Sequence, residues 1–184
     1  MTNLQKIVVV IALFVGSASA ADFRVLNVGE SCATVRDSEI AVGSKPTTWS
    51  GISAHVYAFV GQEFGREVEI SYFCPYGTLF VGNYFIPEQS LNDAIRSYRE
   101  MYAQLSSKLG EPTLDNSPWQ KETAKNHLPI PSDRSKYYVA WHGQRMDTVL
   151  SFLLSGDSSN ANWKVAIAVM PNKETREATP KFPH

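Results

Sequence analysis

A nineteen-residue amphipathic segment near the middle of the chain constrains the fold more than any other feature. Residues 91–109 place apolar side chains at intervals of three and four residues, the spacing that lines one side of an α-helix. The members of this stripe are Leu91, Ile95, Tyr98, Tyr102, Leu105 and Leu109. Ser90 is a good N-cap with Asp93 three residues on, and Gly110 followed by Pro112 ends the pattern. We therefore predict a helix over 91–109 whose apolar side is buried.

Segments with strand chemistry lie on both sides of this helix. They alternate apolar with polar residues or are rich in β-branched and aromatic residues. The segments are 55–60, 67–74 and 78–86 before the helix, and 136–141, 147–154 and 162–170 after it. A short helix is also expected within 30–42. This order predicts a single-domain α+β fold in which two three-stranded antiparallel meanders build a sheet and the long helix packs on one face.

The first twenty residues have the layout of a secretory signal peptide. A polar start with one Lys is followed by the apolar run 7–15 and by small residues ending in an Ala18-x-Ala20 cleavage pattern. Nine apolar residues are too few for a membrane span, which takes about twenty. We predict a signal peptide over 1–20, one domain over 21–170 and a flexible tail over 171–184, in a periplasmic or secreted protein without a membrane anchor.

The charge balance argues against nucleic acid as a partner. The signal peptide holds one Lys and no acid, so 16 basic and 18 acidic residues remain, a net charge of −2. No basic excess therefore attracts phosphate groups or anionic lipid. The chain also lacks a G-x-G-x-x-G motif and a phosphate-binding loop, so no cofactor is predicted.

Cys32 and Cys74 are the chain's two cysteines. In an oxidising compartment such an even pair predicts a disulfide, which stabilises a domain by roughly 4 kcal/mol when it closes a loop of this length. The alternative is a reactive thiol at Cys32, near the start of the short helix. No Cys-x-x-Cys motif accompanies it, so we favour the structural disulfide.

No complete catalytic motif occurs in the chain. Ser53 lacks the closing glycine of a nucleophile elbow, and the four histidines lack metal-ligand spacing, so no metal site is predicted. The densest polar cluster is 141–147, a predicted hairpin tip. There His142 and Asp147 are weak catalytic candidates, as a base and the carboxylate that orients it. A solvated hairpin tip explains the same residues without catalysis.

Aromatic residues and one long loop are the candidate binding features. The segment 111–135 has no clear periodicity and holds four prolines, and connections of this length are commonly functional or disordered. We take Trp119 and His127 in this segment, with Tyr76 in a turn, as candidate binding residues. Aromatic residues also occupy both sides of the second and third strands: Tyr72, Phe73, Tyr76, Phe80, Tyr84 and Phe85. Their second side either meets a partner or packs under another layer.

Glu67 and Glu69 share one side of the second predicted strand. A pair of carboxylates suits a glycosidase, but acids opposite an apolar side more simply mark the solvated side of the strand.

Three functions stay open from the sequence. The first is a non-enzymatic protein-binding module, such as an inhibitor, an immunity-type protein or an assembly factor that binds another exported protein. The second is a secreted hydrolase that uses His142 and Asp147. The third is a carrier of a small apolar ligand between helix and sheet.

Overall fold

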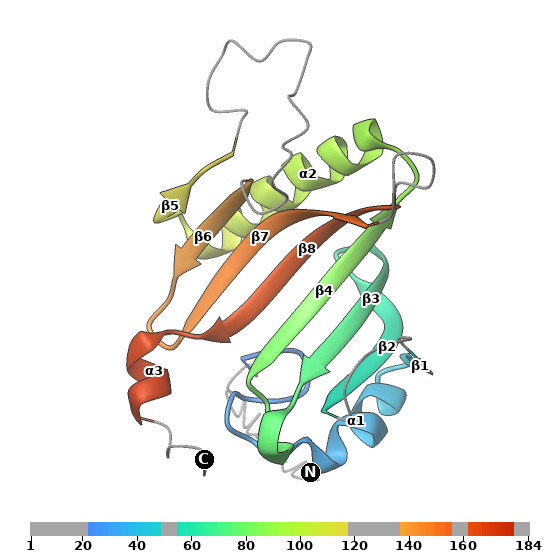
Figure 1. Ribbon diagram of the computed structural model, residues 1–184, viewed down its shortest axis with the longest axis vertical. Helices are drawn as coiled ribbons and strands as arrows, with labels where there is room; N and C mark the ends of the chain where they lie inside the picture. Colours follow the sequence, from blue (N-terminus) through green and yellow to red (C-terminus); the bar gives the residue numbers. More distant parts are fainter. Residues whose placement is uncertain (1–21, 49–54, 118–136, 156–161, 179–184) are drawn as a thin grey trace, which may run out of the picture.

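An eight-stranded antiparallel sheet forms the centre of the computed structural model, which describes residues 22–48, 55–117, 137–155 and 162–178. The strands follow the order β1-β2-β3-β4-β8-β7-β6-β5 (Figure 1). Their bounds are β1 Lys45–Thr47, β2 Val56–Glu63, β3 Arg66–Phe73, β4 Val81–Glu88, β5 Leu114–Asp115, β6 Tyr138–His142, β7 Met146–Ser155 and β8 Asn162–Pro171. The predicted α+β class with an antiparallel sheet is confirmed.

The two halves of the sheet meet at β4 and β8, which pair from Gly82 opposite Val169 to Glu88 opposite Trp163. The strands β1 and β5 extend the sheet at its two edges and were not predicted. They are three and two residues long, too short to show a periodic pattern, and β5 lies inside the expected loop 111–135.

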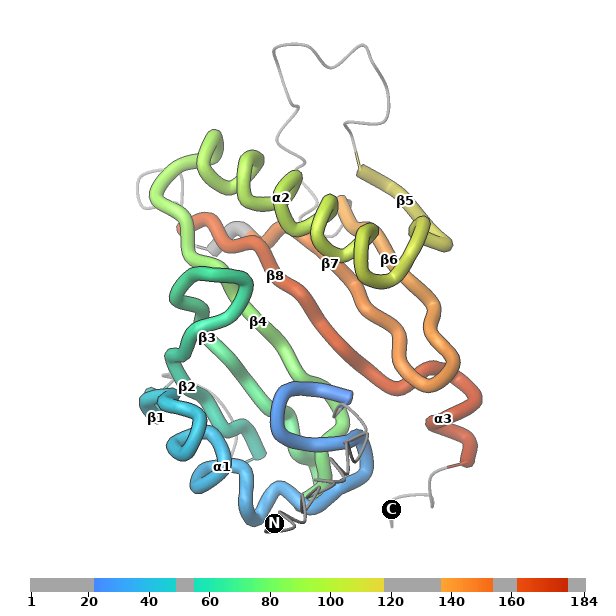
Figure 2. The backbone as a smooth tube through the Cα atoms, turned by 180° about the vertical axis from the view of Figure 1, so that it is seen from behind, coloured from blue at the N-terminus to red at the C-terminus, as the bar shows by residue number. Residues whose placement is uncertain are grey.

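The main helices and the N-terminal segment lie on one face of the sheet (Figure 2). The helical elements are η1 Cys32–Thr34, α1 Val35–Ala41, η2 Pro75–Gly77, α2 Leu91–Leu109 and α3 Lys173–Ala178. The helix α3 lies beyond the end of β8 and within the range predicted as a tail (Figure 1). Among the described helices, none is both long enough and apolar enough to span a bilayer.

The helix α2 begins at a side-chain cap. Ser90 is extended, accepts a hydrogen bond from the backbone N–H of Asp93 at 3.1 Å and donates one to its carboxylate at 2.6 Å. The buried residues of the helix are Ala94, Ser97, Tyr98, Met101 and Leu105. Leu109, which the predicted stripe included, is 44% exposed. The buried side is thus rotated from the predicted one and includes the small residues Ala94 and Ser97.

Large side chains fill the space between α2 and the sheet. Tyr98 stacks on Phe152 of β7 with a ring-centroid distance of 4.8 Å. Tyr102 contacts Trp141 of β6, whose indole N–H donates to the carbonyl of Gly110 at 2.9 Å. These contacts fix the C-terminal half of α2 to β6 and β7.

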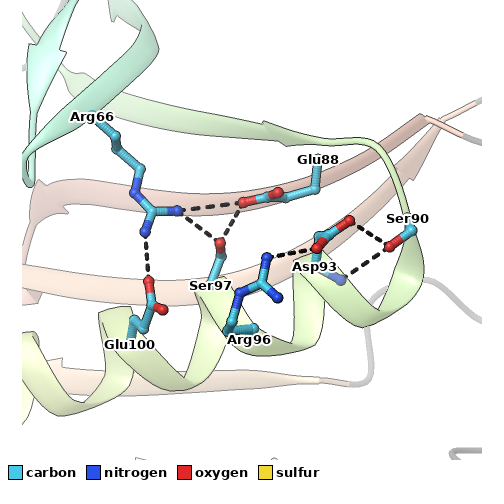
Figure 3. Close-up of polar contacts among 7 residues, drawn as sticks. All are labelled: Arg66, Glu88, Ser90, Asp93, Arg96, Ser97 and Glu100. Atoms are coloured by element: carbon cyan, nitrogen blue, oxygen red, sulfur yellow. Dashed lines mark hydrogen bonds and ion pairs between the residues drawn. The ribbon is translucent and has the colours of Figure 1, made fainter.

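A polar cluster fixes the N-terminal half of α2 to the sheet (Figure 3). Ser97 is buried, accepts a hydrogen bond from Arg66 of β3 at 2.7 Å and donates one to Glu88 of β4. Arg66 also pairs with Glu100 at 2.5 Å. One guanidinium group therefore joins two strands and the helix.

The N-terminal segment, residues 22–31, packs on the same face of the sheet next to α1. Phe23 is buried against Tyr72 and Tyr84. Arg24 pairs with the buried Glu39 of α1 at 2.8 Å and with Glu63 of β2. These contacts join the start of the described chain to α1 and the sheet.

The predicted disulfide between Cys32 and Cys74 is confirmed. It links η1 to the residue that follows β3, and both cysteines are buried. Such a bond is typical of proteins outside the cytoplasm.

Candidate functional site

The face of the sheet opposite α1 and α2 is here called the helix-free face, because no helix among the described residues lies across it (Figure 1). The row Ile70, Tyr84, Ile167, Leu150 and Val139 is buried on the helix side. Side chains alternate along a strand, so the residues flanking this row belong to the helix-free face. Two rows at its centre are Val60, Glu69, Phe85, Ala166, Ser151 and Tyr138, and Ala58, Ser71, Asn83, Ala168, Val149 and Ala140.

The helix-free face is mostly apolar. Outside its two central rows it also contains Val56, Phe73, Val81, Met170, Leu153 and Leu114. An antiparallel sheet with one side in water normally alternates apolar residues toward the core with polar residues toward solvent. This sheet departs from that pattern over most of its strands. A contiguous apolar face of this kind is a candidate interaction surface.

Two small residues of β8 belong to the centre of the helix-free face. Ala166 and Ala168 are successive residues of β8 on this face, with Ile167 between them on the helix side. Phe85 of β4 lies directly opposite Ala166. Ala166 is only 6% exposed. Neighbouring side chains of the same chain therefore already cover Ala166.

The sequence contains a signal for this surface that our prediction did not use. In 162–170, apolar residues alternate with Lys164, Ala166 and Ala168 rather than with a fully polar set. A strand that is apolar on both sides is typical of one that is covered on both sides.

Two of the charged groups on the helix-free face pair with each other. Lys164 of β8 crosses β4 to reach Glu69 of β3 at 2.6 Å, and both side chains are less than one quarter exposed. The predicted acid pair Glu67 and Glu69 is thereby divided, because Glu69 takes a cationic partner and Glu67 stays exposed. Such pairing keeps the face close to neutral.

The two catalytic candidates lie at one corner of the helix-free face. His142 and Asp147 are opposite each other in the β6–β7 hairpin, and Nδ1 lies 2.9 Å from a carboxylate oxygen. The backbone N–H of His142 donates to the Thr113 hydroxyl. The side chain of His142 is 60% exposed. The hydrogen-bond contact suits a base and its orienting carboxylate. The catalytic role itself stays a prediction.

The structure brings together no metal-ligand set within its described residues: they hold no group of three or more His, Cys, Asp or Glu side chains suited to a metal ion. Ser53 lies outside the described residues.

The three predicted binding residues are not brought together. Trp119 and His127 lie outside the described residues. Tyr76 is 63% exposed in η2, directly after the disulfide, and has a φ of 60°. A positive φ is unusual for a large side chain and often marks a functional turn.

The aromatic residues of β3 and β4 divide between the two faces. Tyr72 and Tyr84 are buried on the helix side, whereas Phe73 and Phe85 belong to the helix-free face. The ring of Phe73 contacts that of Phe80 at 6.4 Å. The site that the geometry assembles is therefore an apolar aromatic surface with one ion pair, Lys164–Glu69, and a hydrogen-bond contact between His142 and Asp147. No known protein-family model, curated protein or solved structure matches this chain.

Proposed function

We propose that this protein is an exported, non-enzymatic module that binds a protein through its helix-free face. An inhibitor, an immunity-type protein and an assembly factor all work in this way. In this proposal the two meanders and the helix over 91–109 form a rigid scaffold that leaves the opposite side of the sheet open.

The observation that carries the proposal is the apolar composition of a sheet face across which no helix of the described residues lies. The centres of protein interfaces are enriched in aromatic residues and Met and are depleted of unpaired charge. The helix-free face has this composition in Phe85, Tyr138 and Met170, with its Lys164–Glu69 pair already formed. Burial of such a surface against a partner is favourable by about 25 cal/mol per Å² of apolar area.

A matched pair of arginine variants tests the proposal. Ala168→Arg places a charge at the centre of the helix-free face, and Ala103→Arg makes the same change on the solvent side of α2. Wild-type protein and Ala103→Arg should recover the same partner from a periplasmic extract. Ala168→Arg should lose it while keeping the wild-type circular dichroism spectrum. Recovery of that partner by Ala168→Arg would overturn the proposal.

The contact between His142 and Asp147 supports a secreted hydrolase as the second candidate. This function predicts that His142→Ala abolishes hydrolysis of a cell-wall or ester substrate without a change in melting temperature. His55→Ala, at another exposed histidine, is the control. Equal activity in the two variants would exclude this role for His142.

A further inference from the structure

We infer that the N-terminal segment, residues 22–31, acts as a strap that opens and closes as one unit on the helix side of the sheet. The ion pair between Arg24 and Glu39 holds the closed position. Opening loosens α1, while α2 and the central strands stay folded. This inference goes beyond the proposed function, because the segment lies on the face opposite the helix-free face (Figure 2).

The N-terminal segment spans both halves of the sheet. Arg24 pairs with Glu63 of β2 at 2.5 Å, and Asp22 pairs with Arg145, in the turn between β6 and β7, at 3.3 Å. The side chain of Arg145 is 59% exposed and that of Arg24 is 9% exposed. Exposed ion pairs contribute little to stability. The buried contacts of Arg24, together with the ring of Phe23, therefore hold the segment on the sheet.

The segment is also hydrogen-bonded within itself. Phe23 and Leu26 exchange two backbone hydrogen bonds, at 3.0 and 2.9 Å. The Asp22 carboxylate accepts a hydrogen bond from the backbone N–H of Val28 at 3.1 Å. These contacts do not involve the sheet, so the segment can leave the sheet in one piece.

The carboxylate of Glu39 depends on the N-terminal segment for its cation. Arg24 donates to both carboxylate oxygens, from Nε at 2.8 Å and from Nη2 at 3.2 Å. The Ser44 hydroxyl, at 2.5 Å, and the Tyr72 hydroxyl also donate to this carboxylate. Glu39 is fully buried, and a buried charge that loses its partner is strongly destabilising. Opening of the segment therefore favours a movement of α1 that lets water reach Glu39.

The helix α1 depends on two buried side chains of its own. It is seven residues long, and its buried residues are Val35 and Glu39. Helices of this length are not stable without tertiary packing. The disulfide between Cys32 and Cys74 holds η1, which directly precedes α1, on the sheet. Opening thus begins in the N-terminal segment and affects α1, whereas the disulfide keeps both attached to the sheet.

The backbone of Arg24 is strained in the closed position. Its φ is 45°, in the left-handed region that residues with large side chains seldom adopt. Such a conformation persists only where the surrounding contacts enforce it. The guanidinium contacts of Arg24 with Glu39 and Glu63 meet this requirement. Their loss favours opening, because the backbone is then released from the strain.

Hydrogen exchange of the mature, oxidised protein under native conditions tests the inference. Two backbone bonds cross from the segment to Leu79. The N–H of Gly29 donates to the Leu79 carbonyl, and the N–H of Leu79 donates to the Glu30 carbonyl, both at 2.9 Å. The amides of Gly29 and Leu79 should share an opening free energy that lies below that of β8 and changes little in dilute urea, because local opening exposes little surface. Exchange of these amides only together with β8, and with the urea dependence of β8, would overturn the inference.

Arg24→Met tests the ion pair. The protection of the Gly29 and Leu79 amides should fall by roughly a hundredfold or more, because Glu39 loses its partner. The Ser44 amide, which donates to the Glu39 carbonyl at 2.9 Å, should lose protection with them. A Ser44 amide that stays protected after the segment has opened would overturn the link to α1 and with it the inference.

Two further variants support this comparison. Arg36→Gln removes a cation from the exposed side of α1 and should keep the wild-type protection. Arg24→Lys keeps the charge but cannot contact both carboxylate oxygens in the same way, so it should lose less protection than Arg24→Met. It serves as the test variant if circular dichroism shows that Arg24→Met does not fold. Wild-type protection in a folded Arg24→Lys and a folded Arg24→Met would equally overturn the inference.

A second substitution separates the charge of Arg24 from the packing of its side chain. Glu39→Gln replaces the buried charge by a neutral amide, which needs no cation. Arg24→Met should therefore reduce the protection of Gly29 and Leu79 much less in the Glu39→Gln background than in wild type. Equal reductions in the two backgrounds would show that packing, and not the ion pair, holds the segment, and would overturn the inference.

Discussion

Phe23 occupies a space that exists because position 82 has no side chain. A Cβ atom built on Gly82 would lie 2.2 Å from Cγ of Phe23, closer than any real contact. The ring also contacts Tyr72 and Tyr84, with centroid distances of 5.0 and 4.7 Å. One glycine therefore decides whether the N-terminal segment can pack on the sheet.

We expect Gly82→Ala to lower the free energy of unfolding by roughly 1–3 kcal/mol through overpacking, and Phe23→Ala to lower it by roughly 3–5 kcal/mol. In the Phe23→Ala background, Gly82→Ala should lower the free energy of unfolding by much less, because the Phe23 ring is absent. Urea unfolding of the four proteins in this double-mutant cycle measures the coupling. Additive losses would show that the two residues do not share this space.

Tyr72 makes the protein sensitive to alkaline pH. Its burial, and the hydrogen bond that its hydroxyl donates to Glu39, raise the pKa of the phenol well above the ordinary value near 10. Burial likewise raises the pKa of Tyr84 and Tyr98. The folded chain then keeps protons that the unfolded chain loses, so this stabilisation is complete below about pH 10 and falls as pH rises further.

We expect the free energy of unfolding to decline with pH above about 10, and to decline less steeply in Tyr72→Phe, which has no phenol to ionise in the unfolded chain. Urea unfolding at a series of alkaline pH values gives both slopes. Parallel slopes in wild type and variant would rule out Tyr72 as a source of the dependence.

At the scale of elements, α2 shows what spacing determines and what it leaves open. Its ends follow from the capping residues Ser90 and Gly110, which are local features. The rotation of α2 about its own axis does not follow from local features. Two neighbouring stripes of a helix fit intervals of three and four residues almost equally well. The structure buries Ser97, a polar residue, since Arg66 and Glu88 on distant strands satisfy its hydroxyl. Spacing along α2 carries no information about those strands.

Ser97→Ala and Ser107→Ala should change stability in opposite directions. The first removes a buried hydroxyl that bonds two charged groups and should cost roughly 1.5–3 kcal/mol. The second is on the exposed side of α2 and should gain a few tenths of a kcal/mol from helix propensity. Chemical unfolding measures both. A stabilised Ser97→Ala would show that the polar cluster does not hold the helix.

The candidate site was less predictable than the strands that carry it. Alternation in 67–74 correctly separates Val68, Ile70 and Tyr72 from the side that holds Glu67 and Glu69. The helix-free face depends instead on strand order and register, which bring Ala166 next to Phe85 across 81 positions of sequence. No local pattern fixes that pairing. The edge strands were missed for a related reason, since only their neighbours in the sheet define them.

At the scale of the whole molecule, the disulfide joins elements that the sheet does not connect. Cys32 directly follows the N-terminal segment, as the first residue of η1, and Cys74 follows β3, a sequence separation of 42 residues. The backbone around it also pairs, because Ser31 bridges to Thr78. The bond therefore holds the N-terminal segment and α1 against one half of the sheet.

Replacement of both cysteines by alanine should lower the free energy of unfolding by roughly 4 kcal/mol, because the unfolded chain gains the freedom that the bond removes. Guanidinium unfolding measures the loss, and wild type treated with a reductant should behave in the same way. A double variant as stable as the oxidised protein would contradict this account.

The placement of β8 between β4 and β7 has a consequence for the order of events in biosynthesis. The ribosome makes this strand last among the eight, yet it fills the middle of the sheet. Until residue 171 has emerged, β4 lacks its inner neighbour and the two halves cannot close on each other. A nascent chain of this topology cannot complete its sheet before its last strand is available.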